Sequence, residues 1–105
     1  PWAEERLAPF GLGIPARARV GDLTPAHRQF VEIIKALIAR PRVLLLDEPT
    51  STLDLDGVRQ LMGIVRDLTA QGTGVLYVSH RLPEILELAD RVTVLRDGVH
   101  QGTFY

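Results

Sequence analysis

Apolar residues recur along this chain with two different periods, and each period predicts a different kind of element. Spacings of three and four residues predict helices at 25–39, 55–70 and 82–89. Short continuous apolar runs predict buried strands at 43–47, 74–79 and 91–96. Because helices and strands alternate over short connections, the pattern indicates an α/β fold with a parallel sheet and right-handed crossovers.

Local signals mark where these helices begin and end. Thr24 is a suitable N-cap for the first helix, and Pro25 fits its first position. Pro41 ends that helix, because the residue before a proline is pushed out of the helical region. Asp54 or Asp56 opens the second helix. The first two helices therefore each have a start signal of their own.

The two ends of the chain carry signals of other kinds. Near the C-terminus, the pair Asp97-Gly98 predicts a two-residue hairpin turn, with a returning strand over 99–104. At the N-terminus we expect a short helix near 1–7, followed by a loop over 9–22 that is rich in glycine and proline.

Composition excludes several classes of function. The chain has 105 residues, 46% of them apolar and 24% charged, which fits one soluble domain or part of one. With 12 basic and 13 acidic residues the net charge is −1, so we expect no nucleic acid as a partner. The absence of cysteine excludes disulfides, thiolate metal sites and a cysteine nucleophile.

Targeting signals and membrane spans are absent from the sequence. No apolar run approaches the ~20 residues that a membrane helix needs. The N-terminus lacks a basic start followed by an apolar core, so we see no signal peptide and expect the cytoplasm. Because the first residue is Pro1 and not Met, we expect a fragment or a processed product.

Two adjacent acids follow the most apolar strand. The continuous run at 43–47 is typical of a strand buried on both faces of a parallel sheet. Asp47 and Glu48 stand at its carboxyl end, where open α/β sheets bind ligands. Asp47 can hold a hydrated Mg²⁺, and Glu48 can polarise an attacking water. The alternative is a strand that simply ends in solvated acids.

A histidine and a helix start complete the candidate chemistry. His80 follows the next strand, so it shares one rim with the acids and can donate to a γ-phosphate oxygen. The alternative is a histidine that caps the following helix or is exposed. The helix start at Thr24 and Pro25 is a candidate anion site, or else an ordinary capped helix.

Several segments resemble motifs of one family. Segments 45–50, 51–54 and 78–80 resemble, in order and in spacing, the Walker B motif, D-loop and H-loop of ABC transporter ATPases. Segment 23–29 stands where that family carries its Leu-Ser-Gly-Gly-Gln signature. Further similarity to the first ATPase cassette of sugar importers, of the ribose and galactoside type, lies in segments 31–37, 79–85 and 89–98.

The resemblance implies a fold and an organisation. The expected fold is an incomplete P-loop NTPase (RecA-like) parallel sheet with flanking helices and a C-terminal β-hairpin. The chain would be the C-terminal half of a nucleotide-binding cassette. Residues 1–40 would end the helical subdomain with its signature-like motif, and residues 41–105 would form the core with Walker B, D-loop and H-loop.

The resemblance also implies roles for individual residues. It implies that Asp47 holds Mg²⁺, that Glu48 is the catalytic base and that His80 contacts the γ-phosphate of ATP. Asp54 would communicate across a dimer of cassettes.

The signature itself is degenerate. By the resemblance, Thr24, Ala26 and His27 would face the ATP of the opposite cassette. Thr24 keeps the hydroxyl of the family's serine, whereas Pro25 removes an N–H donor. Ala26 adds a Cβ where the family has glycine, and His27 replaces glutamine.

One motif of the family is missing from the sequence. There is no Gly-x-x-x-x-Gly-Lys-Ser/Thr, so no loop of N–H groups cradles the phosphates. We therefore expect the chain alone to neither bind ATP tightly nor hydrolyse it. In the family, the P-loop strand lies between the strands predicted at 74–79 and 91–96. Without it two apolar edges are open, which predicts a strand rearrangement, a remnant of the missing half nearby, or self-association.

These inferences combine into one functional hypothesis. The chain would be part of the ATP-hydrolysing subunit of an ABC importer for sugars, with ATP and Mg²⁺ as cofactors. Its partners would be a second nucleotide-binding domain and membrane permease subunits, at the cytoplasmic face of the cell membrane. The alternatives are a soluble non-transport ABC ATPase, such as a translation or repair factor, and a non-catalytic interaction module.

Overall fold

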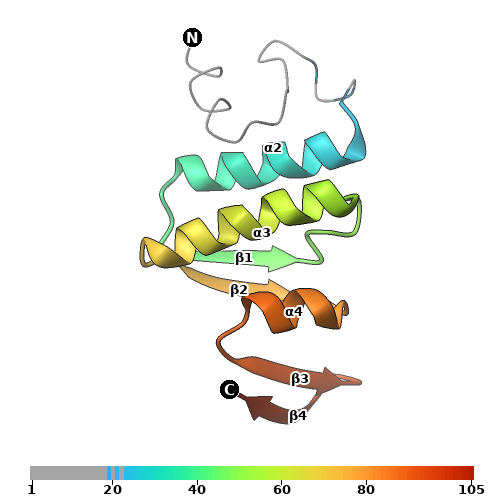
Figure 1. Cartoon of the computed structure of the whole chain (residues 1–105), viewed down its shortest axis with the longest axis vertical. Helices are drawn as coiled ribbons and strands as arrows, with labels where there is room; N and C mark the ends of the chain where they lie inside the picture. The colour runs from blue at the N-terminus through green and yellow to red at the C-terminus, as the bar shows by residue number, and fades with distance from the viewer. Residues whose placement is uncertain (1–18, 20, 22) are drawn as a thin grey trace.

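A computed structural model describes residues 19, 21 and 23–105 (Figure 1). The short helix predicted at 1–7 and most of the predicted loop lie outside the described residues. The elements follow the predicted order, and their bounds are α2 (Pro25–Ile38), β1 (Val43–Asp47), α3 (Leu55–Ala70), β2 (Gly74–Val78), α4 (Leu82–Leu88), β3 (Val92–Arg96) and β4 (Val99–Phe104). Predicted and observed bounds differ by one residue at most.

Both long helices begin with a side-chain cap. The Thr24 hydroxyl accepts a hydrogen bond from the His27 N–H at 3.1 Å at the start of α2. At α3 the Asp54 carboxylate accepts from the Gly57 N–H at 2.8 Å, so Asp54 and not Asp56 is the cap. Each cap satisfies an amide that would otherwise have no partner within the helix.

Within the described residues, the strands form two separate two-stranded sheets. β1 and β2 are parallel, with Val43 opposite Gly74 and Asp47 opposite Val78. β3 and β4 form the predicted antiparallel hairpin, which turns at Asp97 and Gly98. No strand pairing joins β2 to β3 within residues 42–104, so this part of the chain does not form one closed sheet (Figure 1).

The core lies on one side of the parallel pair, where α3 and α2 are stacked over it (Figure 1). It combines apolar side chains from α2, β1, the connection to α3, and α3 itself, namely Phe30, Ile33, Leu44, Leu46, Leu53, Leu61 and Val65. Met62, predicted to fill the core, is also buried. Packing of these side chains holds the carboxyl end of β1 in place.

The prediction that β1 is buried on both faces is wrong. Leu44 and Leu46 are 6% and 7% exposed, whereas Val43 and Leu45 are 63% and 69% exposed. Alternate residues of a strand point to opposite faces, and among the described residues only one face is covered by helices. The continuous apolar run therefore has one face in the core and one face exposed.

Candidate active site

The parallel pairing brings the carboxyl ends of β1 and β2 to the same edge. Asp47, the last residue of β1, lies opposite Val78 and is exposed. The Glu48 N–H donates to the Val78 carbonyl at 2.8 Å, which continues the ladder one residue past the strand. His80 follows β2 by two residues. The register thus places Asp47, Glu48 and His80 on one rim.

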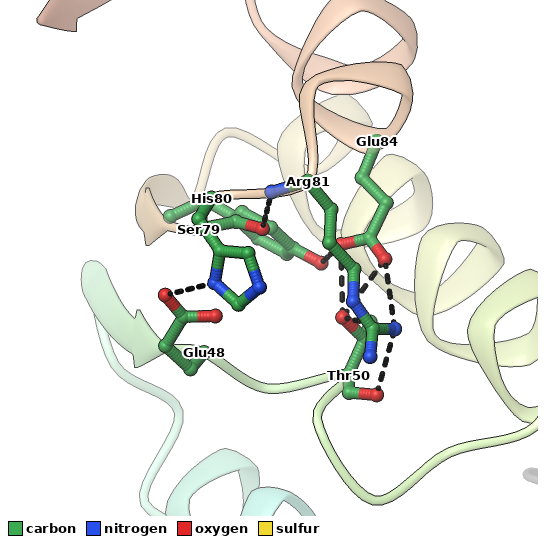
Figure 2. A network of polar contacts seen from close by, with 7 residues as sticks. Glu48, Thr50, Ser79, His80, Arg81 and Glu84 are labelled. Carbon is green, nitrogen blue, oxygen red and sulfur yellow. Dashed lines mark hydrogen bonds and ion pairs between the residues drawn. The ribbon is translucent and has the colours of Figure 1, made fainter.

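Glu48 and His80 are in direct contact on this rim (Figure 2). His80 Nδ1 lies 2.9 Å from Glu48 Oε1. Their side chains are 77% and 37% exposed, so the pair opens to solvent and to ligands. Since an ionised carboxylate can only accept, the contact requires a proton on His80 Nδ1. The structure therefore brings together the predicted base and the predicted imidazole.

The backbone at Glu48 is in the left-handed region, with φ of 48°. This region is unfavourable for any residue with a Cβ, and such residues are concentrated at functional sites. Here it turns the chain sharply at the end of β1, so that Pro49 and Thr50 go into the interior, where both are buried. The side chain of Glu48 stays at the surface.

A buried polar cluster lies next to the Glu48–His80 contact (Figure 2). Glu84 is its centre, 6% exposed, and its two carboxylate oxygens accept the Thr50 hydroxyl at 2.8 and 2.9 Å. The Tyr77 hydroxyl donates to the same carboxylate at 2.9 Å, and Arg81 Nη1 lies 3.6 Å from it. We refer to Thr50, Tyr77, Arg81 and Glu84 as the Glu84 cluster.

The cluster changes the chemistry of its tyrosine. Burial raises the pKa of Tyr77 well above its ordinary value of 10, and the hydrogen bond to the Glu84 carboxylate raises it further. Tyr77 is therefore a neutral donor at any physiological pH. A phenol that keeps its proton suits a buried carboxylate, which needs donors.

The residues predicted to bind a cofactor gather in one groove. Thr24, Ala26, His27 and Asp54 all line a groove of about 410 Å³ between the starts of α2 and α3. Two of these side chains, Thr24 and Asp54, already serve as helix caps. Since Pro25 has no N–H and the His27 N–H donates to Thr24, this helix start offers few backbone donors to an anion.

The candidate metal ligand, Asp47, does not belong to a preformed metal site in the described part of the chain. In the part of the chain that the structure describes, no three His, Cys, Asp or Glu side chains gather as a cation site. Mg²⁺ usually takes one or two protein carboxylates and completes its shell with water and phosphate oxygens. A single exposed Asp47 at a strand end fits that role.

Sequence reasoning missed the Glu84 cluster. Its members come from the loop after β1, from β2 and from the start of α4, and Thr50 is 34 positions from Glu84. The one signal available was Tyr77, a polar group within an apolar strand that has to find a hydrogen-bond partner when buried. Nothing in the sequence identifies Glu84 as that partner.

The fold is that of an ATP-binding cassette of the ABC transporter class. A nucleotide-free ATP-binding cassette from an ABC transporter aligns with 96% of this chain, with a TM-score of 0.84 and 25% identity. A bacterial ABC transporter cassette solved as a dimer aligns with 97%, with a TM-score of 0.86 and 27% identity. The chain covers 40% and 44% of those structures. The predicted fold class is confirmed.

Sequence relatives are more specific. The chain is 54% identical over 96 residues to ribose import ATP-binding protein RbsA 1 of Rubrobacter xylanophilus, and 50% identical over 94 residues to ribose import ATP-binding protein RbsA 2 of Mesorhizobium japonicum. These matches include 91% and 88% of this chain but only 19% and 18% of the relatives, so the chain spans about a fifth of their length. No family model matches. The resemblance to sugar-importer cassettes is confirmed.

Proposed function

We propose that this chain supplies the Walker B, D-loop and H-loop portion of an ATP-hydrolysing cassette that drives sugar import. The observation that carries the proposal is the 2.9 Å contact between Glu48 and His80 at the ends of neighbouring parallel strands. A carboxylate and an imidazole on one rim suit the attack of water on a terminal phosphate. The names of the relatives, ribose import ATP-binding proteins, support the same substrate class.

Each rim residue has a separate task in this proposal. Asp47 would hold Mg²⁺, and the bound ion would neutralise charge on the phosphate oxygens of ATP. Glu48 accepts a proton from the attacking water. His80 donates a hydrogen bond toward the γ-phosphate.

The observed contact sets a condition on His80. A neutral ring that uses its Nδ1 proton for Glu48 has only an acceptor at Nε2. His80 can therefore donate to phosphate only as an imidazolium, or after its contact with Glu48 has opened. When the contact opens, the Glu48 carboxylate also loses its hydrogen bond to His80 and becomes free to accept a proton from water. Opening of the contact would therefore couple the role of Glu48 as base to the role of His80 as donor.

The groove at the starts of α2 and α3 is proposed to face a second cassette. Thr24, Ala26 and His27 would meet the nucleotide held by that partner, and Asp54 would communicate across the dimer. One of the solved neighbours is itself a dimeric cassette. The few backbone donors left at this helix start predict a weak contribution from the signature side.

Transport requires partners beyond this chain. We propose that membrane permease subunits hold the cassette dimer at the cytoplasmic face of the cell membrane, since the relatives are import proteins. Among the helices of residues 23–105, none is long and apolar enough to cross a bilayer.

A chimeric cassette tests the proposal directly. In it, this chain replaces the matching segment of ribose import ATP-binding protein RbsA 1 from Rubrobacter xylanophilus, and the rest of that ATP-binding protein is kept. We expect Mg-ATP hydrolysis that Glu48→Gln lowers about 10²- to 10⁴-fold, the usual loss of a general base. Glu87→Gln, on the exposed side of α4, is the matched control and should leave the rate unchanged.

A folded chimera that does not hydrolyse ATP would instead support a non-catalytic interaction module. Hydrolysis that permease subunits never stimulate would support the non-transport alternative.

The isolated chain is the second arm of this test. Because its sequence has no P-loop, we predict no tight binding of Mg-ATP to the 105-residue chain. Isothermal titration calorimetry measures this, and micromolar affinity would contradict it.

A further inference from the structure

We propose that Glu84 is a positioning residue that holds Glu48 and His80 in their mutual orientation. The inference deepens the proposed function and rests on it, because it concerns the same rim. The polar partners of Glu84 are Thr50, Tyr77 and Arg81, and neither Glu48 nor His80 is among them. Glu84 acts through the two segments that carry the pair, one after β1 and one after β2 (Figure 2).

The Glu84 cluster joins these segments at two points. Thr50, two residues after Glu48, donates its hydroxyl hydrogen bond to Glu84, four residues after His80. Arg81, directly after His80, donates from Nη1 to the Thr50 carbonyl at 3.1 Å. Both links cross between the same two segments, so neither segment can shift along the other without breaking one of them.

The centre of the cluster is buried, whereas the Glu48–His80 pair is exposed. Thr50 is 1% exposed and Glu84 is 6% exposed, and buried hydrogen bonds are strong because little water competes. The Glu48–His80 contact is 37% and 77% exposed, and exposed ion pairs contribute little by themselves. The exposed contact therefore depends on buried neighbours for its geometry.

Tyr77 fixes the cluster to the sheet. Its hydroxyl donates to Glu84 at 2.9 Å from within β2, so the carboxylate is tied to the strand that leads to His80. No buried side-chain nitrogen or oxygen lacks a partner in the described part of the chain. A fully satisfied network of this kind selects one arrangement of the segments that it joins.

A pair of substitutions at Thr50 separates hydrogen bonding from packing. Thr50→Val keeps the shape and removes the hydroxyl, whereas Thr50→Ser keeps the hydroxyl and removes a methyl group. Long-range ¹H–¹⁵N NMR at about pH 8 reports which ring nitrogen of His80 carries the proton in the isolated chain. We expect the Nδ1–H fraction to fall about twofold or more in Thr50→Val and to stay unchanged in Thr50→Ser.

A second readout uses the chimeric cassette. A lost orientation lowers kcat more than it changes KM, so we expect Thr50→Val and Glu84→Gln to lower kcat about tenfold, with KM for ATP within about twofold. Thr50→Ser should retain kcat, and Glu87→Gln, which lies outside the cluster, should match the unmodified chimera.

The two readouts fail separately. A folded Thr50→Val protein with an unchanged His80 tautomer overturns the positioning role, as does a Thr50→Ser protein that loses as much as Thr50→Val. Where Thr50→Val does not fold, Tyr77→Phe takes its place with the same expected change. The tautomer is measured without ATP, so its outcome stands whether or not the chimera hydrolyses ATP.

Discussion

Glu48 carries both a chemical group and a strained backbone, and the two are separable by substitution. Its φ of 48° costs about 1 kcal/mol for a residue with a Cβ and nothing comparable for glycine. We predict that the free energy of unfolding of Glu48→Gly is about 1 kcal/mol higher than that of Glu48→Ala, although both variants lack the carboxylate. Urea unfolding of the isolated chain measures the difference. Equal stability would mean that the turn does not strain this residue.

Tyr77 makes stability depend on alkaline pH. Its pKa in the folded protein is raised above the ordinary value of 10, chiefly by burial. The unfolded chain therefore releases this proton first as pH rises. The contribution of Tyr77 is complete below about pH 10 and is lost progressively as pH rises toward the folded pKa.

The chain has two tyrosines, and a phenylalanine substitution at each provides the test and its control. Tyr77→Phe should flatten the fall in unfolding free energy above pH 10, and at pH 7 it should cost about 1–2 kcal/mol because the buried Glu84 carboxylate loses a donor. Tyr105, 94% exposed, provides the control Tyr105→Phe. Urea titrations at a series of pH values give both quantities. An equally steep fall without the Tyr77 hydroxyl would contradict the assignment.

At the scale of elements, Asp54 combines an observed role as a helix cap with a second, proposed role. It caps α3 through Gly57, and we propose that it also communicates across the cassette dimer. Asparagine caps about as well as aspartate, whereas alanine does not cap. We predict that Asp54→Asn keeps the stability of the chain within a few tenths of a kcal/mol, while Asp54→Ala costs about 1 kcal/mol. Thermal unfolding followed by circular dichroism distinguishes these outcomes.

The chimeric cassette then tests the second role. Loss of ATP hydrolysis in Asp54→Asn with intact stability would assign Asp54 a task beyond the cap. Unchanged hydrolysis in Asp54→Asn would show that the carboxylate serves α3 alone.

The same scale shows what sequence could and could not predict. Caps, proline and glycine are local signals, so the bounds of α2, α3 and the hairpin were predictable from Thr24, Asp54 and Asp97-Gly98. That Glu48 and His80 share one rim was predictable too, because parallel strands end at one edge, but their direct contact was not predicted. The burial of β1 was not predictable from the sequence. A continuous apolar run such as β1 looks the same whether one face of the strand or both faces are covered.

At the scale of the whole molecule, the described residues leave an apolar surface without cover. Leu45 and Leu76 lie opposite each other in the register of β1 and β2, and they are 69% and 58% exposed. Beside them β2 has an edge that no other described strand pairs with, since none joins it to β3 (Figure 1). An open edge next to an exposed apolar face is a template for pairing with another chain.

We therefore predict that the isolated chain self-associates through this surface. Sedimentation velocity over about a twentyfold range of concentration should show a mass that rises with concentration, as mass action requires. Leu76→Lys places a charge on the face beside the open edge and should shift the chain toward monomer. Leu86→Lys is the control, since Leu86 is 71% exposed on α4 and lies outside both sheets. A chain that stays monomeric throughout, or a control that dissociates equally, would show that this face does not mediate contacts between copies.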